Sequence, residues 1–154
     1  GQVVLRRKCN GAKPATEAAD VRSLSSEVRS RKRQMIRGYQ DLEVYRRSYN
    51  LALRLHQMTL QFPSHERYEL GSQIRRSAVS VTLNIAEGYG RKSSPNEFKH
   101  FIRNALGSTN EVRVLVDMAK DLGYLESVAY RELAEEYQIL GKQLYRLMER
   151  WRKI

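Results

Sequence analysis

The stretch QIRRSAVSVTLNIAEGYGRK, residues 73–92, decides the fold of this chain. Ile74, Ala78, Val81 and Ile85 follow one another at spacings of four, three and four residues, which places them on one face of an α-helix. Several residues between them are small, so that a neighbouring helix can approach closely. The stretch therefore predicts a helix that packs tightly inside a group of helices.

Two polar residues, Asn84 and Glu87, interrupt this apolar run. A buried carboxylate without a partner costs free energy, so we expect Glu87 to meet an arginine or capping donors. We interpret the pair as a structural polar network that fixes helix register or subunit packing, in preference to a catalytic pair. Gly88 and Gly90 are expected to end the helix, because glycine readily takes left-handed backbone angles.

Length and composition indicate one domain that lies in the cytoplasm. A chain of 154 residues with 41% hydrophobic residues can form a real core. It contains no apolar run of about 18 residues, so no membrane-spanning helix is expected. The single cysteine, Cys9, excludes an internal disulfide and fits a reducing compartment.

The net charge of +11 is unevenly distributed along the chain. Residues 1–40 carry +7 and residues 41–154 carry +4. A basic balance favours polyanions such as nucleic acid, or an anionic membrane surface, without saying anything about sequence specificity. A charge that only keeps the protein soluble is the alternative.

Residues 1–37 differ from the rest and are predicted to be a basic leader before a bundle domain of residues 38–154. The leader could be a flexible tail or an arm that binds nucleic acid. A third interpretation is that Met35 is the natural start and that the preceding residues are not native. We favour the third interpretation, because organised hydrophobic patterning begins just after Met35.

The first helix is expected over about residues 41–60, with Asp41 as its N-cap. Two apolar sides compete to face the core of the bundle. The side that we predict to face inward consists of Leu42, Tyr45, Tyr49, Ala52, Leu53, His56 and Leu60. The second apolar side consists of Val44, Leu51, Leu55 and Met58.

Two further helices are expected over about residues 65–89 and 95–122. Ser64 is a candidate cap for the earlier one, and Gly71 within it indicates close packing, since glycine weakens a helix by about 1 kcal/mol. Ser94, followed by proline and then by Glu97 three residues on, is a capping box that starts the later helix.

The last helix is expected over about residues 127–152. Apolar residues recur there at alternating spacings of three and four, as in the seam of a bundle or coiled coil. They are Tyr130, Leu133, Tyr137, Leu140, Leu144, Leu147 and Trp151. Four helices joined by short turns predict an all-α fold, an antiparallel up-down-up-down four-helix bundle.

Several separated motifs resemble one known family over about residues 38–152. They are YQDLEVY (39–45), QIRRSAV (73–79), NIAEG (84–88), Arg91-Lys92, Phe98, Phe101, Ala105, Gly107-Ser108, Glu111 and AKDLGYL (119–125). Together they are similar to the bacterial four-helix-bundle proteins named after reading frames in the intervening sequences of 23S ribosomal RNA. The resemblance implies a bundle that assembles into a ring, expected to be a homopentamer, and a non-enzymatic role linked to RNA. Accessory proteins of diversity-generating reverse transcriptases look like more distant relatives.

The basic residues around the junction of the second and third helices are the candidates for contact with RNA. Arg91, Lys92, Lys99 and Arg103 can cluster at one end of the bundle and meet phosphates. Arg75 and Arg76 lie roughly 24 Å away along a straight helix, so we expect them near the other end of the bundle or at a subunit contact. We group them with Asn84 and Glu87 as a candidate assembly or structural polar network. The alternative for all of these residues is solvated charge or ion pairs between subunits.

A di-metal carboxylate site is the sharpest enzymatic alternative. Glu97 and His100 have the spacing that ferritin-like sites use, but such sites need this motif on two helices. His56 and His65 follow apolar residues at that spacing, so a second copy is lacking. We therefore expect no metal, no cofactor and no catalytic residue. The remaining alternative function is a protein–protein assembly scaffold, or an accessory subunit of a nucleic-acid enzyme, without RNA specificity of its own.

Overall fold

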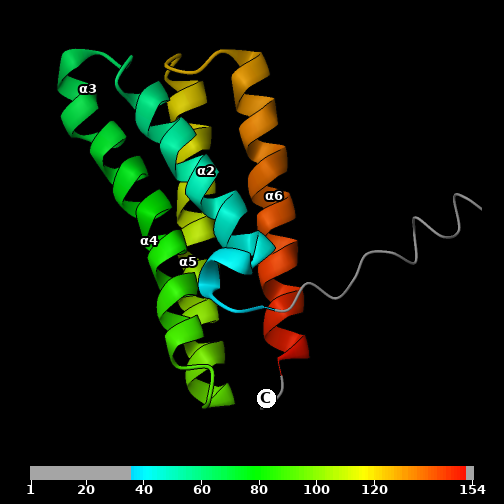
Figure 1. Cartoon of the computed structure of the whole chain (residues 1–154). Helices are drawn as coiled ribbons and strands as arrows, with labels where there is room; N and C mark the ends of the chain where they lie inside the picture. Colours follow the sequence, from blue (N-terminus) through cyan, green and yellow to red (C-terminus); the bar gives the residue numbers. More distant parts are fainter. Residues whose placement is uncertain (1–35, 152–154) are drawn as a thin grey trace, which may run out of the picture. The chain divides into compact units, whose positions relative to one another are not determined.

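The described part of the chain is entirely helical in its regular elements (Figure 1). The computed structural model describes residues 36–151, and the predictions made for the leader before Ile36 lie outside them. The elements are η1 (Tyr39–Asp41), α2 (Glu43–Thr59), α3 (Ser64–Tyr68), α4 (Leu70–Gly90), α5 (Pro95–Asp121) and α6 (Ser127–Arg150).

The four long helices form the predicted bundle. α4 packs on both α2 and α5, α5 packs on α6, and α6 approaches α2 less closely. Gln73 bonds Glu111 at one end of the α4–α5 pair, whereas Arg91 pairs with Glu97 at the other end, so these helices run antiparallel. Figure 1 shows the same alternation of direction around the whole bundle. The prediction of an all-α, up-down-up-down bundle is confirmed.

The core contains the apolar stripes predicted for α4 and α6. Ile74, Ala78, Val81 and Ile85 of α4 are almost fully buried, as the opening stretch predicts. Burial of each large aliphatic side chain stabilises the fold by about 1.5–3 kcal/mol. The stripe of α6 is buried through its middle at Leu133, Tyr137, Leu140 and Leu144. Burial also raises the pKa of the Tyr137 phenol.

The side of α2 that faces the core is not the predicted one. Tyr49 and Leu53 of the predicted stripe are about half exposed, at 47% and 51%. The buried residues of α2 are Val44, Ser48, Leu51, Leu55 and Thr59. Two of these are polar, and their hydroxyls donate to backbone carbonyls one turn earlier, which removes the cost of burying them. Their polarity concealed the core stripe in the sequence.

The second predicted helix is two helices, because the backbone breaks at Glu69. The Arg75 side chain bridges the break, donating to the carbonyl of Arg67 at 3.0 Å and to the Thr59 hydroxyl at 2.9 Å. Ser64 is the first residue of α3 and does not cap it from outside. The prediction of close packing at Gly71 is confirmed, since a Cβ there would lie 3.2 Å from a carbonyl oxygen of α3.

The predicted caps agree with the structure only in part. Ser94 caps α5 and accepts from the backbone N–H of Glu97 at 3.4 Å, as predicted. The other half of the predicted capping box is not formed, because the Ser94 N–H donates to the Arg91 carbonyl and the Glu97 carboxylate pairs with Arg91. Asp41 belongs to η1, and Leu42 occupies the N-cap position of α2. The Asp41 carboxylate instead accepts from the backbone N–H groups of Arg37 and Gly38, which lowers its pKa.

The two glycines at the end of α4 play a different part from the predicted one. α4 runs through Gly90, and neither Gly88 nor Gly90 takes a left-handed backbone angle. A Cβ on Gly88 would lie 3.1 Å from the Cβ of Phe101, so this glycine allows α5 to approach α4. Gly123, which follows α5, has a φ of +79°, a left-handed backbone angle at which glycine ends helices.

Candidate nucleic-acid interface

Arg91 and Lys92, the first half of the predicted RNA cluster, are engaged within the protein. Arg91 lies 3.4 Å from the Glu87 carboxylate and 3.6 Å from that of Glu97, with its guanidinium over the Phe101 ring. The Lys92 ammonium donates to the Tyr89 hydroxyl at 3.0 Å. The carboxylates offset much of the charge of Arg91, which makes it a weaker partner for an external phosphate.

Lys99 and Arg103, the second half of the cluster, belong to a longer stripe along α5. Leu106, Asn110 and Arg113 continue it at alternating spacings of three and four, so all five share one side of the helix. Among the ion pairs within residues 36–151, none involves Lys99, Arg103 or Arg113. The predicted cluster is therefore divided between two surfaces.

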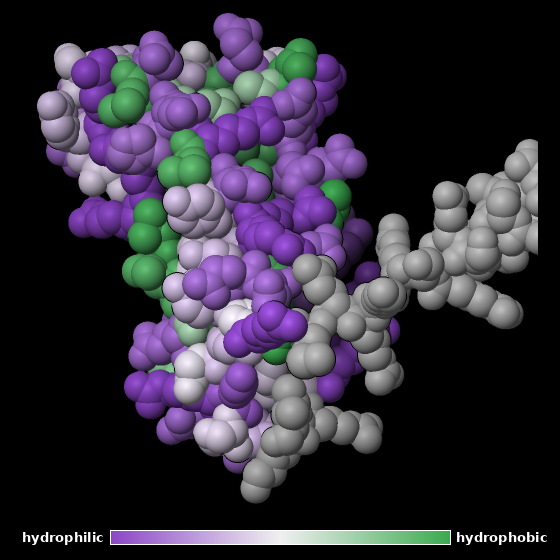
Figure 2. Space-filling view, viewed as in Figure 1, coloured by the Kyte–Doolittle hydropathy of each residue, from purple (hydrophilic) through white to green (hydrophobic). Residues whose placement is uncertain are grey.

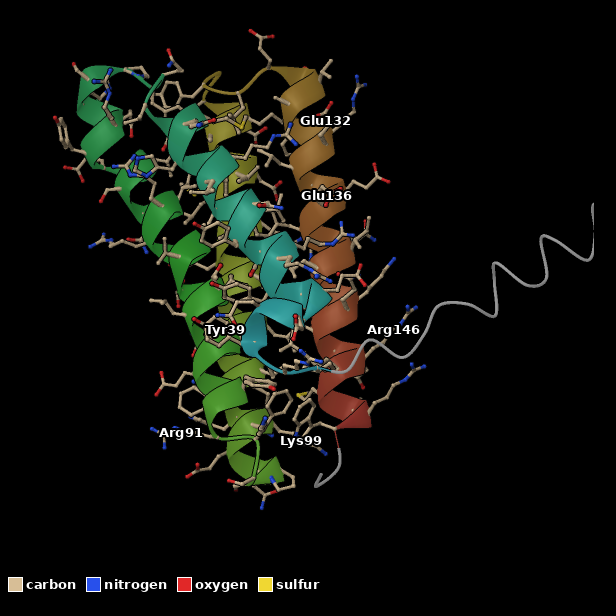
Figure 3. The ribbon with its side chains drawn as sticks, viewed as in Figure 1. Tyr39, Arg91, Lys99, Glu132, Glu136 and Arg146 are labelled. Atoms are coloured by element: carbon tan, nitrogen blue, oxygen red, sulfur yellow. The ribbon has the colours of Figure 1, made fainter. Side chains whose placement is uncertain are left out.

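The part of the α5 stripe from Leu106 to Arg113 forms one wall of a groove of about 420 Å³ between α5 and α6, and Lys99 and Arg103 lie before it. The groove is lined by Leu106, Asn110 and Arg113 of α5 and by Gln138, Gly141, Lys142, Tyr145 and Arg146 of α6. Three of these residues are cationic and none is acidic. Figure 3 shows Arg146 and Lys99 in the half of the bundle that lies away from α3. We refer to this feature as the α5–α6 groove.

Sequence reasoning missed the α6 half of this groove. Lys142 and Arg146 are four residues apart, on the side of α6 next to its core stripe, and that spacing is visible in the sequence. What the sequence does not show is which side of α6 faces α5. The hydrogen bond of 2.9 Å from the Tyr130 hydroxyl to Asp117 fixes that pairing, and it also raises the pKa of Tyr130.

The four residues predicted as an assembly network share one surface without bonding one another. Arg75, Arg76, Asn84 and Glu87 all line a hollow of about 590 Å³ on the outer side of α4. Arg76 bonds Gln73 and Asn84 bonds Ser80, each within its own helix. Glu87 is exposed rather than enclosed by the apolar run, and it meets Arg91 as expected of a paired carboxylate.

A second groove, between α2 and α4, is apolar. It has a volume of about 230 Å³ and is lined by Tyr45, Tyr49, Ala52, Leu53, His56, Arg75, Val79, Thr82 and Leu83. Leu83 is 62% exposed and Val79 is 48% exposed, in addition to the two exposed residues of α2. Figure 2 shows hydrophobic residues gathered along the α4 side of the molecule. We refer to this feature as the α2–α4 groove.

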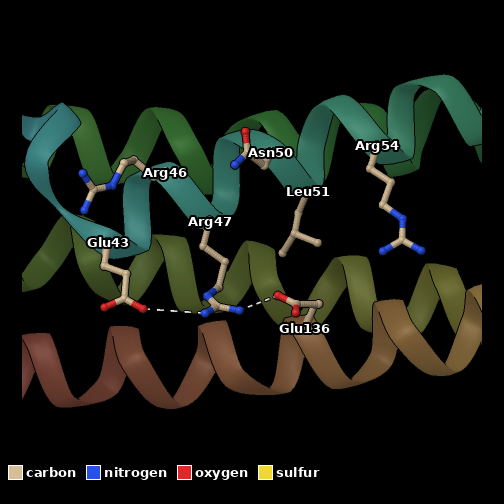
Figure 4. A pocket seen from close by; sticks show the side chains of 7 residues that line it. All are labelled: Glu43, Arg46, Arg47, Asn50, Leu51, Arg54 and Glu136. Carbon is tan, nitrogen blue, oxygen red and sulfur yellow. Dashed lines mark hydrogen bonds and ion pairs between the residues drawn. The ribbon is translucent and has the colours of Figure 1, made fainter. Parts of the chain in front are cut away.

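Between α2 and α6, cations and carboxylates alternate (Figure 4). Arg47 pairs with Glu136 of α6 and lies 3.6 Å from Glu43 of its own helix. Arg54 pairs with Glu132. Because carboxylates match these arginines, the hollow of about 390 Å³ beside them lacks the one-sided charge of the α5–α6 groove.

Glu97 and His100, the residues of the di-metal alternative, make other contacts in the structure. Glu97 pairs with Arg91, and the His100 ring lies within 3.5 Å of the Asn104 amide. Within residues 36–151, no three histidine, cysteine or carboxylate side chains come together as metal ligands. None of the helices described is long and apolar enough to cross a membrane.

A sequence model of the 23S rRNA-intervening sequence protein family matches residues 40–146 of this chain. The chain belongs to this family. Its fold is also similar to the crystal structure of a protein of unknown function from the S23 ribosomal protein family of Bacteroides thetaiotaomicron, with a TM-score of 0.63. The two are 20% identical, and the similarity covers 69% of this chain and 95% of the other. No curated protein is similar enough to count as a relative.

Proposed function

We propose that this chain is a non-enzymatic, self-assembling bundle that associates with RNA. The RNA would be the intervening sequence of 23S rRNA or another ribonucleoprotein, in keeping with the family to which the chain belongs. The observation that carries the proposal is the row of cations along α5, from Lys99 through Arg103 to Arg113, which forms no ion pair within residues 36–151. Such a row can neutralise phosphates and release their counterions.

The α2–α4 groove supports the self-assembly in this proposal. Four large apolar side chains there, Tyr49, Leu53, Val79 and Leu83, are about half exposed or more. Contiguous exposed apolar surface of this kind commonly marks a protein interface. A head-to-tail contact of this groove with a second copy would close into a ring, and we propose the pentamer that the family resemblance implies. The lone Cys9 and the RNA partner both fit a protein that acts in the cytoplasm.

The alternative function is a protein–protein assembly scaffold, or an accessory subunit of a nucleic-acid enzyme such as a reverse transcriptase. The engagement of Arg91 by two carboxylates favours it, because that removes one predicted phosphate contact. In this alternative the α2–α4 groove is the working surface and the basic charge keeps the protein soluble.

Light scattering of the purified protein with and without a structured RNA tests the proposal. We expect a defined oligomer whose mass increases with RNA, and an RNA affinity that falls steeply as salt is raised. The full chain and a form that begins at Met35 are compared, so that binding by the leader is separated from binding by the bundle. An oligomer with weak RNA binding that no bundle substitution affects would favour the scaffold.

A further inference from the structure

We propose that the α5–α6 groove holds single-stranded RNA, with Arg113, Lys142 and Arg146 on the phosphates and Tyr145 stacked on a base. This inference rests on the proposed function and adds to it the site, the form of the RNA and the contacts. The residues that line the groove carry three positive charges and no negative one. Of the four hollows described above, this one has the most one-sided charge.

The cations stand along both walls of the groove. α5 and α6 run antiparallel, since Tyr130 contacts Asp117 and Trp151 contacts Phe98. Counting along the helices from these contacts places Arg103 level with Tyr145. Arg113 is level with Ala134. Arg103 and Arg113 are ten residues apart, so the row on α5 is about 15 Å long. No ion pair within residues 36–151 involves Lys142 or Arg146. The acids nearest in sequence on the two helices are not among the lining residues; they are Glu111, which accepts from Gln73 of α4, and Asp117, Glu136 and Glu149.

Tyr145 gives the groove a feature that plain basic surface lacks. It is 57% exposed and lines the groove between Lys142 and Arg146, so its ring is available to a ligand. Grooves that bind single strands combine cations that follow the backbone with aromatic rings on which bases stack. Asn110 and Gln138 add side-chain amides that can bond either base edges or phosphate oxygens.

The shape of the groove favours a single strand over a duplex. Two packed helices have axes only about 8–10 Å apart, so the furrow between them is too narrow to admit a double helix. A duplex would touch only the rim, where Tyr145 has no unstacked base to meet, because stacking on protein aromatics needs splayed-out bases. An acidic peptide could satisfy the cations, but it would not depend on the aromatic ring.

The test is the binding of a labelled oligouridylate of 20 nucleotides, followed by fluorescence anisotropy at several potassium chloride concentrations. The groove variant is Arg113→Gln with Arg146→Gln. The matched control is Arg46→Gln with Arg131→Gln, two exposed arginines outside the groove, which removes the same charge. Tyr145→Ala removes the aromatic ring, whereas Tyr145→Phe keeps the ring and removes only the hydroxyl, so the two variants test whether the ring stacks on a base. Light scattering on every variant verifies that assembly is unchanged.

Loss of two phosphate contacts should reduce the slope of log K against log salt by about 1.4 in the groove variant, and by much less in the control. Tyr145→Ala should weaken binding about tenfold, and Tyr145→Phe should bind as the wild type does.

Equal slopes in the groove and control variants would overturn the inference while leaving RNA association in place. The inference would also be overturned if polyglutamate displaced the labelled oligonucleotide as well as unlabelled RNA does, from both the wild type and Tyr145→Ala. If the wild type bound structured RNA but not the oligonucleotide, even at about 50 mM salt, where phosphate contacts are strong, that result would refute the groove alone. Absence of all RNA binding would refute the proposed function too.

Discussion

Phe98 and Trp151 stack face to face, with ring centroids 3.8 Å apart and planes 16° from parallel. The pair joins the first turn of α5 to the residue that follows α6, and both rings are buried. It therefore joins α5 to α6 at the end of the bundle where Lys99 begins the basic stripe.

Replacement of this tryptophan should loosen that end of the bundle. Trp151→Ala should lower the free energy of unfolding by about 3 kcal/mol, because it removes a buried aromatic ring and its stacking on Phe98. Trp151→Phe keeps a ring against Phe98 and should lose much less. Urea denaturation followed by circular dichroism measures both variants. Similar losses in the two variants would show that the stack itself contributes little.

The divided cluster predicts unequal effects of two double variants on RNA binding. Lys99→Ala with Arg103→Ala should reduce the salt slope of binding by about 1.4, since each residue can meet a phosphate of a single strand. Arg91→Ala with Lys92→Ala should reduce it by less than about 0.7, because Glu87 and Glu97 already offset Arg91. Binding isotherms at a series of salt concentrations distinguish the two. A larger reduction in the Arg91 variant would reverse this assignment.

The α2–α4 groove predicts where a charge breaks assembly. Leu83→Glu should convert the oligomer into single chains, because a carboxylate would be buried without a partner in the contact. Leu83 is exposed within one subunit, so helical content should be unchanged. Val114→Glu is the matched control, since Val114 is an exposed apolar residue of α5 outside this groove. Retention of the oligomer by Leu83→Glu, or its loss in both variants, would exclude the groove as the contact.

Two glycines should respond in opposite ways to the same substitution. A Cβ on Gly107 meets no atom within 4 Å, so Gly107→Ala should stabilise the bundle by about 1 kcal/mol through helix propensity. A Cβ on Gly71 would lie 3.2 Å from the carbonyl oxygen of Glu66, so Gly71→Ala should destabilise it. The melting temperature should rise by about 4 °C in the former and fall in the latter. A rise in both would mean that α3 can shift away from α4.

The Asp41 carboxylate should make part of the stability depend on pH. Backbone N–H groups of Arg37 and Gly38 bond it, so its pKa in the folded state is lower than the ordinary value of 3.8. Its contribution is therefore present above the unfolded pKa and is lost as pH falls through the folded pKa. Asp41→Asn should be less stable than the wild type at pH 7, and the difference should narrow below pH 3.8. Urea midpoints measured across this range show whether the two proteins converge, and a constant difference would contradict the prediction.

The sequence by itself determined the class of fold and most of its core. Spacings of three and four in α4 and α6 fix which side of each helix is apolar, and Ser94 before α5 and Pro95 at its first position fix its start. These are local properties of one helix at a time. They sufficed to predict four helices in antiparallel order, while the resemblance of several separated motifs predicted the family to which the chain belongs.

Only the tertiary structure decided which of two apolar sides of α2 is buried and which cations act together. α2 buries Ser48 and Thr59 because their hydroxyls find carbonyl partners, and this leaves Tyr49 and Leu53 exposed for another contact. Arg91 is paired with Glu97 across a turn, whereas Arg113 and Arg146, 33 residues apart in sequence, line one groove. Contacts of this kind depend on the rotation of each helix against its neighbours, and helical spacing within one segment carries no information about that rotation.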